Sequence, residues 1–381
     1  MRIHKTLNLA TMQSDQLDSL RGASAIIVVL AHANQIFIAP NYYALVPWVG
    51  LLASSAVMVF FVLSGLLIFK SIEKNLERNK GEFSFSQFFY SRLLRLWPPL
   101  ILALFLMAFF YLIAPLFFPS GTNNFLPAVG NYIARNGYFM EEKEMFGALF
   151  FLNGFFSITP SSNGPLWSLS IEFWYYVIAG LVVWKKKWWK ASCYISALVI
   201  VWIGSTEQQF TYYLCVWWAG YLLGLLHSKE AIPSTKLLWI LLVLFFSSAA
   251  VLASRYIFAV YSNNPIAQSF WLTAYFNISI GFGFSTMLAL MFKGAIIFPT
   301  NFKSVAAYSY SLYILHFPIF LFIFGLAQPV LNGSLVINLI ISTASFVGTI
   351  AIARILSRLV EDKETIRSLI KLLITTKPST G

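Results

Sequence analysis

The sequence is poor in charge. Asp, Glu, Lys and Arg make up 10% of its 381 residues, whereas hydrophobic residues make up 59% and the mean hydropathy is +0.74. Soluble domains carry about 25% charged residues, so the composition excludes a soluble protein and indicates a polytopic membrane protein. The apolar runs extend over about twenty residues, which excludes a β-barrel because barrel strands are short and alternate in polarity.

Cysteine is scarce as well. Cys193 and Cys215 are the only two, and both lie inside apolar runs without the spacing of metal ligands. Nothing in this pattern suggests a disulfide framework, and we expect both cysteines to be small packing residues. No metal site is expected in this sequence. Residues 1–16 are polar and lack the pattern of a cleavable signal, so the first apolar run is expected to remain as an anchor.

The apolar runs predict an all-α membrane protein, a polytopic bundle of about ten transmembrane helices. The bundle covers 17–356, between an N-terminal segment 1–16 and a C-terminal tail 357–381. The predicted spans are 17–38, 49–69, 97–118, 167–184, 191–205, 210–227, 236–257, 269–292, 304–326 and 335–356.

Two further stretches are not expected to span the membrane. The amphipathic stretch 83–96 is expected to lie at the membrane interface before it turns into the third span. The apolar run Phe146–Ile158 is too short to cross a bilayer and is expected to be re-entrant or interfacial.

The formal net charge of +12 would suit a nucleic-acid partner, but the positions of the charges exclude one. When the ten spans alternate between the two sides, all but three of the 26 Lys and Arg fall on one side, and the exceptions are Arg135, Lys143 and Arg255. This imbalance is the positive-inside signature and predicts that both termini are cytoplasmic. The basic excess therefore reflects topology and attraction to anionic membrane lipid.

The first span carries polar groups that are costly inside a membrane. Its sequence, LDSLRGASAIIVVLAHANQIFIA, contains Asp18, Arg21 and His32. Arg21 and His32 are separated by three helical turns plus ~20°, so they share one face about 16 Å apart. Such groups normally face a bundle interior or a wet cavity and are functional. The alternative is that Arg21 is an interfacial anchor and His32 a helix-packing residue.

A pair of arginines precedes the third span. Arg92 and Arg95, in FYSRLLRLWPP, are three residues apart and therefore neighbours on a helix. Two guanidinium groups at a membrane rim can bind phosphate. They also fit ordinary anchoring on the positive side, and the sequence alone leaves both interpretations open.

Glu172, in GPLWSLSIEFWYY, is the only acidic residue well inside a predicted span. Its span enters from the outer side, which places Glu172 about 8 Å below that face, at a depth similar to that of His32. A carboxylate there would orient the imidazole and stabilise its charged form. The alternative is a protonated carboxyl that forms a hydrogen bond between helices.

Two other polar positions stand out. His316, in YSYSLYILHFPI, falls near the middle of its span as a second base, an acceptor-binding group or a helix-packing residue. Ser64 and Gly65, in FFVLSGLLIFKS, allow the close approach of a helix or a ligand. Ser64 lacks the GxSxG context of a serine nucleophile.

Five stretches, in this order, resemble the motifs of the acyltransferase 3 family of membrane acyltransferases. LDSLRGASAIIVVLAH resembles the first-helix signature, FFVLSGLLI the second-helix motif, and FFYSRLLRLWPP the paired-arginine RxxR element. GPLWSLSIEFWYY is similar to the WSLxxE motif and YSLYILHFPI to the late Tyr–His motif. The resemblance runs from about Leu17 to the last spans. Many members carry a fused SGNH hydrolase-like domain, which this chain lacks, so it resembles a stand-alone member.

The resemblance implies an O-acetyltransferase of the bacterial inner membrane. Its expected co-substrate is cytoplasmic acetyl-CoA, with no permanently bound cofactor, and its acceptor is a hydroxyl of a cell-surface or lipid-linked carbohydrate. His32 would act as general base or form an acetyl-His intermediate, assisted by Glu172, while Arg21, Arg92 and Arg95 would bind the donor. The expected supporting residues are Asp18, Ser64, Trp167, Ser168, Tyr313 and His316.

Two other classes share buried polar residues with such an enzyme. A secondary transporter or exporter of a polysaccharide or small molecule does not need a phosphate-binding site. Such a protein usually shows repeat symmetry, and no clear internal repeat is visible in this sequence. It would not consume acetyl-CoA. A structural or signalling membrane protein needs no aligned Arg21 and His32. The sequence does not give the acceptor sugar, the acyl group or the oligomeric state.

Overall fold

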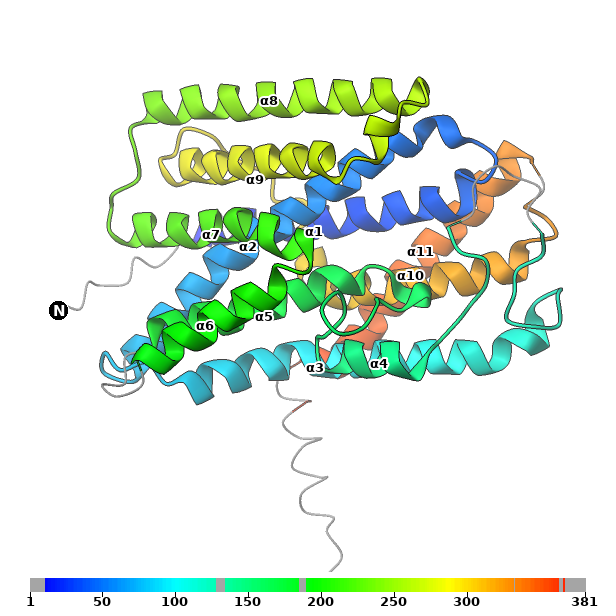
Figure 1. The fold of residues 1–381 in the computed structure, drawn as a ribbon, viewed down its shortest axis with the longest axis horizontal. Coiled ribbons are helices and arrows are strands. Elements are labelled where there is room, and N and C mark those ends of the chain that lie inside the picture. The colour runs from blue at the N-terminus through cyan, green and yellow to red at the C-terminus, as the bar shows by residue number, and fades with distance from the viewer. Residues whose placement is uncertain (1–10, 128–133, 185–189, 332, 363–365, 367–381) are drawn as a thin grey trace, which may run out of the picture.

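The computed structural model describes residues 11–127, 134–184, 190–331, 333–362 and 366 (Figure 1). Helices form most of this part of the chain, and within it isolated β-bridges occur only at two places. The long helices run roughly side by side along the longest axis of the molecule (Figure 1). The predicted all-α polytopic bundle is confirmed.

Each predicted span coincides with one helix. Eight helices in the described residues are long and apolar enough to cross a membrane, and α6 and α7 occupy the two remaining predicted positions. The helices are α1 Thr11–Ala33, α2 Val46–Arg78, α3 Phe85–Phe117, α4 Glu142–Leu149, α5 Leu166–Val183, α6 Lys190–Gly204, α7 Gln208–Ser228, α8 Thr235–Tyr261, α9 Phe270–Phe292, α10 Ser309–Ala327 and α11 Leu335–Val360.

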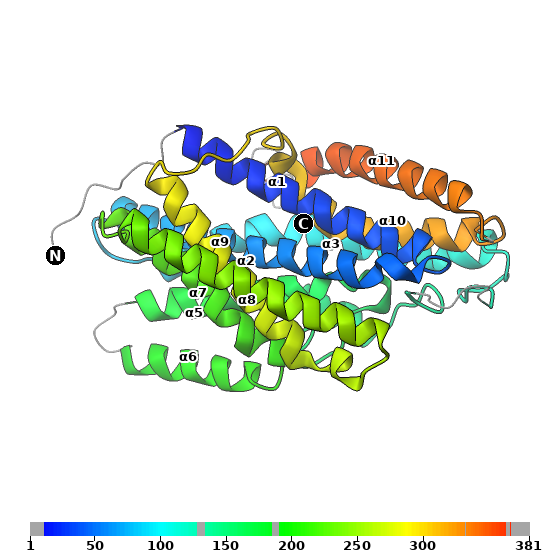
Figure 2. The same ribbon diagram turned by 90° about the horizontal axis from the view of Figure 1, so that it is seen from above.

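Several helices lie at the outside of the bundle. Helices α1, α10 and α11 lie together on one side of the bundle, and α6 lies at the opposite edge (Figure 2). Helix α8 packs on the outside of α9, and only 11% of its most apolar window is buried. An apolar helix with so little burial presents its surface to lipid, so α8 is part of the lipid-facing cover.

Small residues bring α2 and α7 into close contact. A Cβ atom added to Gly65 would lie 2.0 Å from the Trp217 carbonyl oxygen, and one added to Gly220 would lie 2.0 Å from the Val62 carbonyl oxygen. The two backbones therefore touch at both glycines, as small residues permit in membrane helix pairs. The expected close helix approach at Gly65 is confirmed.

The prediction of a separate interfacial segment at 83–96 is wrong. Residues Phe85–Phe117 form one helix, α3, that continues through Pro98 and Pro99. Proline is tolerated inside membrane helices because neighbouring helices support the interrupted ladder. Close to the two prolines, the Tyr310 hydroxyl of α10 donates to the Leu96 carbonyl over 3.0 Å and joins α10 to α3. The result is that the basic pair of α3 is held on a rigid helix against the bundle.

The apolar run Phe146–Ile158 does not span. It contains the end of the short helix α4 and a loop that the buried Asn153 fastens by donating to the carbonyls of Glu144 (3.2 Å) and Ile158 (3.0 Å). The chain then enters the bundle, where the Asn163 side chain is fully buried and donates to the Ile314 carbonyl over 2.9 Å. Consequently α5 begins inside the bundle rather than at its surface.

Candidate functional site

Two cavities lie in succession between α1, α2, α5 and α10. The basic cavity has a volume of about 80 Å³ and the histidine cavity one of about 550 Å³. Only Val57 and Tyr313 line both. The basic cavity is defined by Arg21, Arg92, Arg95, Glu172, Tyr176 and Tyr310, and the histidine cavity by His32, Arg135, Trp167, Tyr256, Tyr313 and Phe317.

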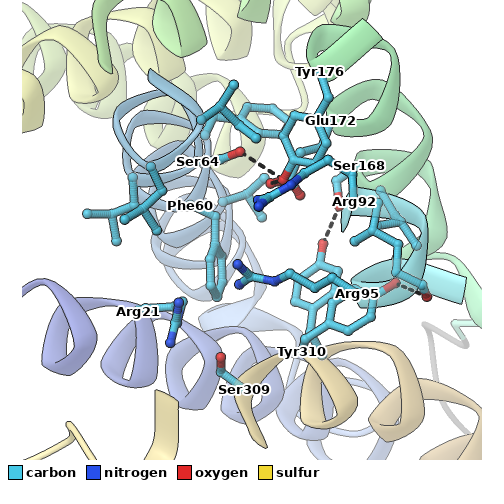
Figure 3. Close-up of a pocket in the computed structure, with 18 residues that line it drawn as sticks. Arg21, Phe60, Ser64, Arg92, Arg95, Ser168, Glu172, Tyr176, Ser309 and Tyr310 are labelled. Atoms are coloured by element: carbon cyan, nitrogen blue, oxygen red, sulfur yellow. Dashed lines mark hydrogen bonds between the residues drawn. The ribbon is translucent and has the colours of Figure 1, made fainter. Parts of the chain in front are cut away.

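Three guanidinium groups from two helices face the basic cavity (Figure 3). Arg21 of α1 pairs with Asp18 (3.0 Å) and donates to the Ala306 carbonyl (3.2 Å), while its buried Nε has no hydrogen-bond partner among the described residues. Arg92 of α3 donates to Ser71 Oγ over 3.1 Å. The electrostatic repulsion of Arg95 acts on both Arg21 and Arg92.

Asp18 and Arg21 are three residues apart on α1, and this helical spacing lets them form an ion pair. Asp18 does not cap the helix, because α1 begins at Thr11, two turns earlier. The Asp18 side chain is 43% exposed, so the ion pair orients Arg21 rather than stabilising the fold strongly.

One carboxylate faces the three arginines. Trp217 Nε1 donates to Ser64 Oγ (3.1 Å), Ser64 donates to the Tyr176 hydroxyl (3.1 Å), and Tyr176 in turn donates to Glu172. This chain fixes the carboxylate at one wall of the cavity (Figure 3). The side chains that line the cavity carry three positive charges and one negative charge. Asp18 and Glu361 offset part of this surplus from outside the cavity. Guanidinium groups match phosphate oxygens, so the lining suits an anionic ligand.

A second carboxylate lies just beyond α11. Glu361 accepts from the Ser311 amide over 2.9 Å at the start of α10. Burial raises the pKa of Glu361, and the nearby positive charges of Arg95 and Arg21 oppose that shift. Glu361 does not line the basic cavity, so it moderates the charge of the arginines without occupying the space of a ligand.

The histidine cavity contains a stacked pair of imidazoles. The His32 and His316 ring centroids are 5.1 Å apart at an interplanar angle of 14°. His316 Nδ1 lies 3.0 Å from the Leu312 carbonyl. A carbonyl only accepts, so Nδ1 carries the proton and Nε2 keeps its lone pair. That Nε2 and His32 Nδ1 are buried without a hydrogen-bond partner among the described residues.

Local backbone structure places His32 at the edge of this cavity. Helix α1 changes into a π-helical turn, Asn34–Ile38, directly after it. Such turns occur often at functional sites because they redirect neighbouring side chains. Here Asn34 and Gln35 join His32 in lining the cavity.

The prediction that Glu172 lies beside His32 is wrong. Glu172 lines the basic cavity and bonds Tyr176, whereas the ring neighbours of His32 are His316 and Phe317. The cause is the buried start of α5, because Trp167 lines the histidine cavity and the helix runs from there toward the arginines. Six residues of helix from Leu166 carry Glu172 about 9 Å away from that level.

Ser168 and Tyr313 lie where the two cavities meet. Their hydroxyl oxygens are 2.6 Å apart, and both residues are buried. Both hydroxyls also reach the Pro165 carbonyl, Ser168 over 3.1 Å and Tyr313 over 3.4 Å, so either one can donate to the other. Among the expected supporting residues, these two form the junction, Trp167 lines the histidine cavity and His316 stacks on His32.

Sequence reasoning missed several lining residues, among them Tyr176, Tyr310 and Arg135. Tyr176 lies one turn after Glu172, and Tyr310 two turns before His316 on α10, so helical spacing from the known motifs could have found both. Arg135 lies among the few basic residues predicted on the outer side, and that rarity was a signal.

Comparison with protein families decides the assignment. The model of one family, described as an acyltransferase domain, matches residues 14–358. The chain belongs to the acyltransferase 3 family. Neither the curated proteins nor the solved structures contain a match. The resemblance predicted from five motifs is therefore confirmed, and with its apolar helices this acyltransferase 3 protein is a multi-pass membrane acyltransferase.

Proposed function

We propose that this membrane acyltransferase moves an acetyl group from acetyl-CoA to a hydroxyl of a cell-surface or lipid-linked carbohydrate. The observation that supports the proposal most is the succession of two cavities with different chemistry. One is lined by arginines and the other by histidines, and they meet at Tyr313. A donor and an acceptor that reach the protein from opposite sides of a membrane need such an arrangement.

The basic cavity is the proposed binding site of the donor phosphates. Arg21, Arg92 and Arg95 lie toward the end where α1 begins, which the distribution of basic residues predicts to be cytoplasmic. The arginines favour phosphate oxygens through charge and through their forked donors. The narrow cavity suits the thin arm of the donor, which would extend past Tyr313 toward His32.

The histidine cavity is the proposed site of the acceptor. Its volume of about 550 Å³ lies in the range of small-molecule pockets. Trp167, Tyr256 and Tyr313 supply aromatic surface for a sugar ring. The topology predicts that this cavity lies toward the outer side of the membrane, where it would hold the acceptor hydroxyl next to His32.

His32 is the proposed general base, held in place by the stacked His316. The acceptor hydroxyl attacks the thioester carbonyl, a C–O bond forms and the C–S bond breaks. The hydroxyl proton passes to His32, and the departing CoA thiolate then takes that proton. Glu172, held by Tyr176, would act on the arginines of the donor site rather than on His32.

The test uses the purified full chain in nanodiscs and measures acetyl-CoA binding and thioester hydrolysis. Wild type should bind and turn over, His32→Ala should bind without turnover, and Arg92→Ala should bind weakly. His227→Ala is the matched control, because that imidazole stacks on Phe292 and lines neither cavity. Full turnover in His32→Ala would exclude the proposed base, and absence of acetyl-CoA binding in wild type would exclude the proposed donor.

A further inference from the structure

Arg135 is an unusual residue for its position. It is one of only three basic residues on the predicted outer side of the membrane, where the positive-inside rule disfavours them. Nevertheless its side chain lines the histidine cavity together with His32. A costly charge placed at a reaction centre calls for a functional explanation.

The guanidinium of Arg135 is fixed in place. Its Nε donates to the Ser161 carbonyl over 2.8 Å and its Nη1 to the Ala134 carbonyl over 2.6 Å. It also lies over the ring of Phe317, 5.5 Å from the centroid. Backbone carbonyls and an aromatic face orient a guanidinium without removing its charge. The positive charge is therefore held at a fixed point in the cavity wall.

This charge dominates the electrostatics of the histidine cavity. Arg135 carries the only charged side chain among the described residues that line it, and no carboxylate does so. The same Phe317 ring that lies below Arg135 meets the His32 ring edge-on at 5.2 Å. Arg135 is thus close enough to act electrostatically on His32.

A positive charge near His32 opposes the proposed reaction when the cavity is empty. A general base becomes positively charged when it takes the acceptor proton, and repulsion from Arg135 disfavours that state. An anion bound between the two cations reverses the effect, because it attracts both. An anionic group on the acceptor would thus turn Arg135 from an obstacle to proton transfer into a binding partner.

We propose that Arg135 binds an anionic group of the acceptor, so that the histidine cavity selects a sugar with a carboxylate or phosphate near the hydroxyl that is acetylated. The proposal rests on the proposed acyl transfer at His32. A guanidinium binds either oxyanion through paired hydrogen bonds. The cavity offers room for one such sugar, with Trp167 and Tyr256 as aromatic walls.

A structural role of Arg135 makes a different prediction. Its hydrogen bond to the Ser161 carbonyl holds the loop that leads into α5, and its bond to the Ala134 carbonyl is local. If that were its only role, its loss would lower activity equally for charged and neutral acceptors. Selection of an anionic acceptor instead changes the ratio between them.

The experiment compares matched acceptors in the wild-type chain in nanodiscs with acetyl-CoA. The methyl glycosides of glucose and galactose are each offered in neutral, 6-carboxylate and 6-phosphate forms. Product is identified by mass spectrometry, and kcat/KM is obtained from thiol release. The wild type should prefer a charged form by about tenfold or more, the value of one charge-assisted hydrogen bond. The preferred form identifies the source of the anion.

Two variants and a control complete the test. Arg135→Gln should lose the preference, and Arg135→Lys, which keeps the charge without the fork, should keep part of it. Arg255→Gln, an exposed arginine on α8, should leave every rate unchanged.

Three outcomes would overturn the inference: equal use of neutral and charged forms by wild type, an unchanged preference in Arg135→Gln, or no acetylation of any form. If none is acetylated but His32-dependent acetyl-CoA hydrolysis persists, the donor half of the proposed function remains. If that hydrolysis is absent as well, both proposals fail.

Discussion

Arg95 provides the sharpest test of the donor site. It lines the basic cavity between Arg21 and Arg92 and repels both of them (Figure 3). Arg21 and Arg92 each have a protein partner, whereas no described residue forms a hydrogen bond or ion pair with Arg95. Replacement of Arg95 by Gln therefore removes proposed ligand-binding donors without removing a hydrogen bond or ion pair within the described residues.

The expected size follows from the interactions that are lost. One hydrogen bond to a charged group contributes about 1.5–3 kcal/mol. The loss of one such bond raises the KM for acetyl-CoA by about 10- to 150-fold, and the loss of a paired contact raises it further. The empty protein should respond in the opposite direction. Removal of one of three mutually repelling charges leaves its thermal stability unchanged or higher.

The assay measures the KM for acetyl-CoA and the melting temperature of Arg95→Gln, with and without CoA. In wild type CoA should raise the melting temperature, and in the variant that increase should shrink because ligand stabilisation follows affinity. Added salt should weaken donor binding by wild type more than by the variant. A KM for acetyl-CoA in Arg95→Gln equal to that of wild type would refute the reasoning. A lower melting temperature of the variant, with unfolding as the cause of its lost activity, would refute it as well.

Three other predictions follow from single contacts. Tyr313→Phe removes the hydroxyl at the junction, and acetyl-CoA hydrolysis without acceptor should rise about 2- to 12-fold, as expected for one buried hydrogen bond; unchanged hydrolysis would contradict the role of the junction. His316→Ala should lower kcat with the KM for acetyl-CoA nearly unchanged, because its ring stacks on His32 and lies away from the arginines; an altered KM alone would contradict it. Gly65→Ala forces α2 from α7 and should destabilise the fold by about 1–3 kcal/mol in thermal melts, whereas Gly50→Ala on the same helix, with open space around it, should not.

Hydropathy predicted the helices well because the membrane imposes their length and composition. Every backbone polar group must be satisfied within the segment, so an apolar run of sufficient length has one outcome, a helix. The lipid-facing helices α8 and α11 are the simplest examples, with little of their apolar windows buried. The closeness of Arg92 and Arg95 followed equally directly from helical spacing.

The depth of Glu172 was not predictable in the same way. The estimate assumed that α5 starts at the membrane surface, but the polar segment before it enters the bundle. Asn163 fastens that segment by donating to the Ile314 carbonyl. A tertiary hydrogen bond of this kind leaves no trace in a hydropathy profile, because a polar segment that dips inward looks the same as a surface loop. For the same reason the sequence did not place Arg135 beside His32.

Helices α1 and α10 together explain how one bundle could separate the proposed donor and acceptor sites. They run in the same direction and pack against each other. Along α10, Tyr310 lines the basic cavity, Tyr313 the junction, and His316 stacks on the base, each about one turn after the last. Along α1, Arg21 and His32 mark the two ends of the same route. Because helical periodicity keeps each set on one face, these two helices fix the path from the proposed phosphate site to the proposed base, and Val57 and Tyr313 line both cavities along it.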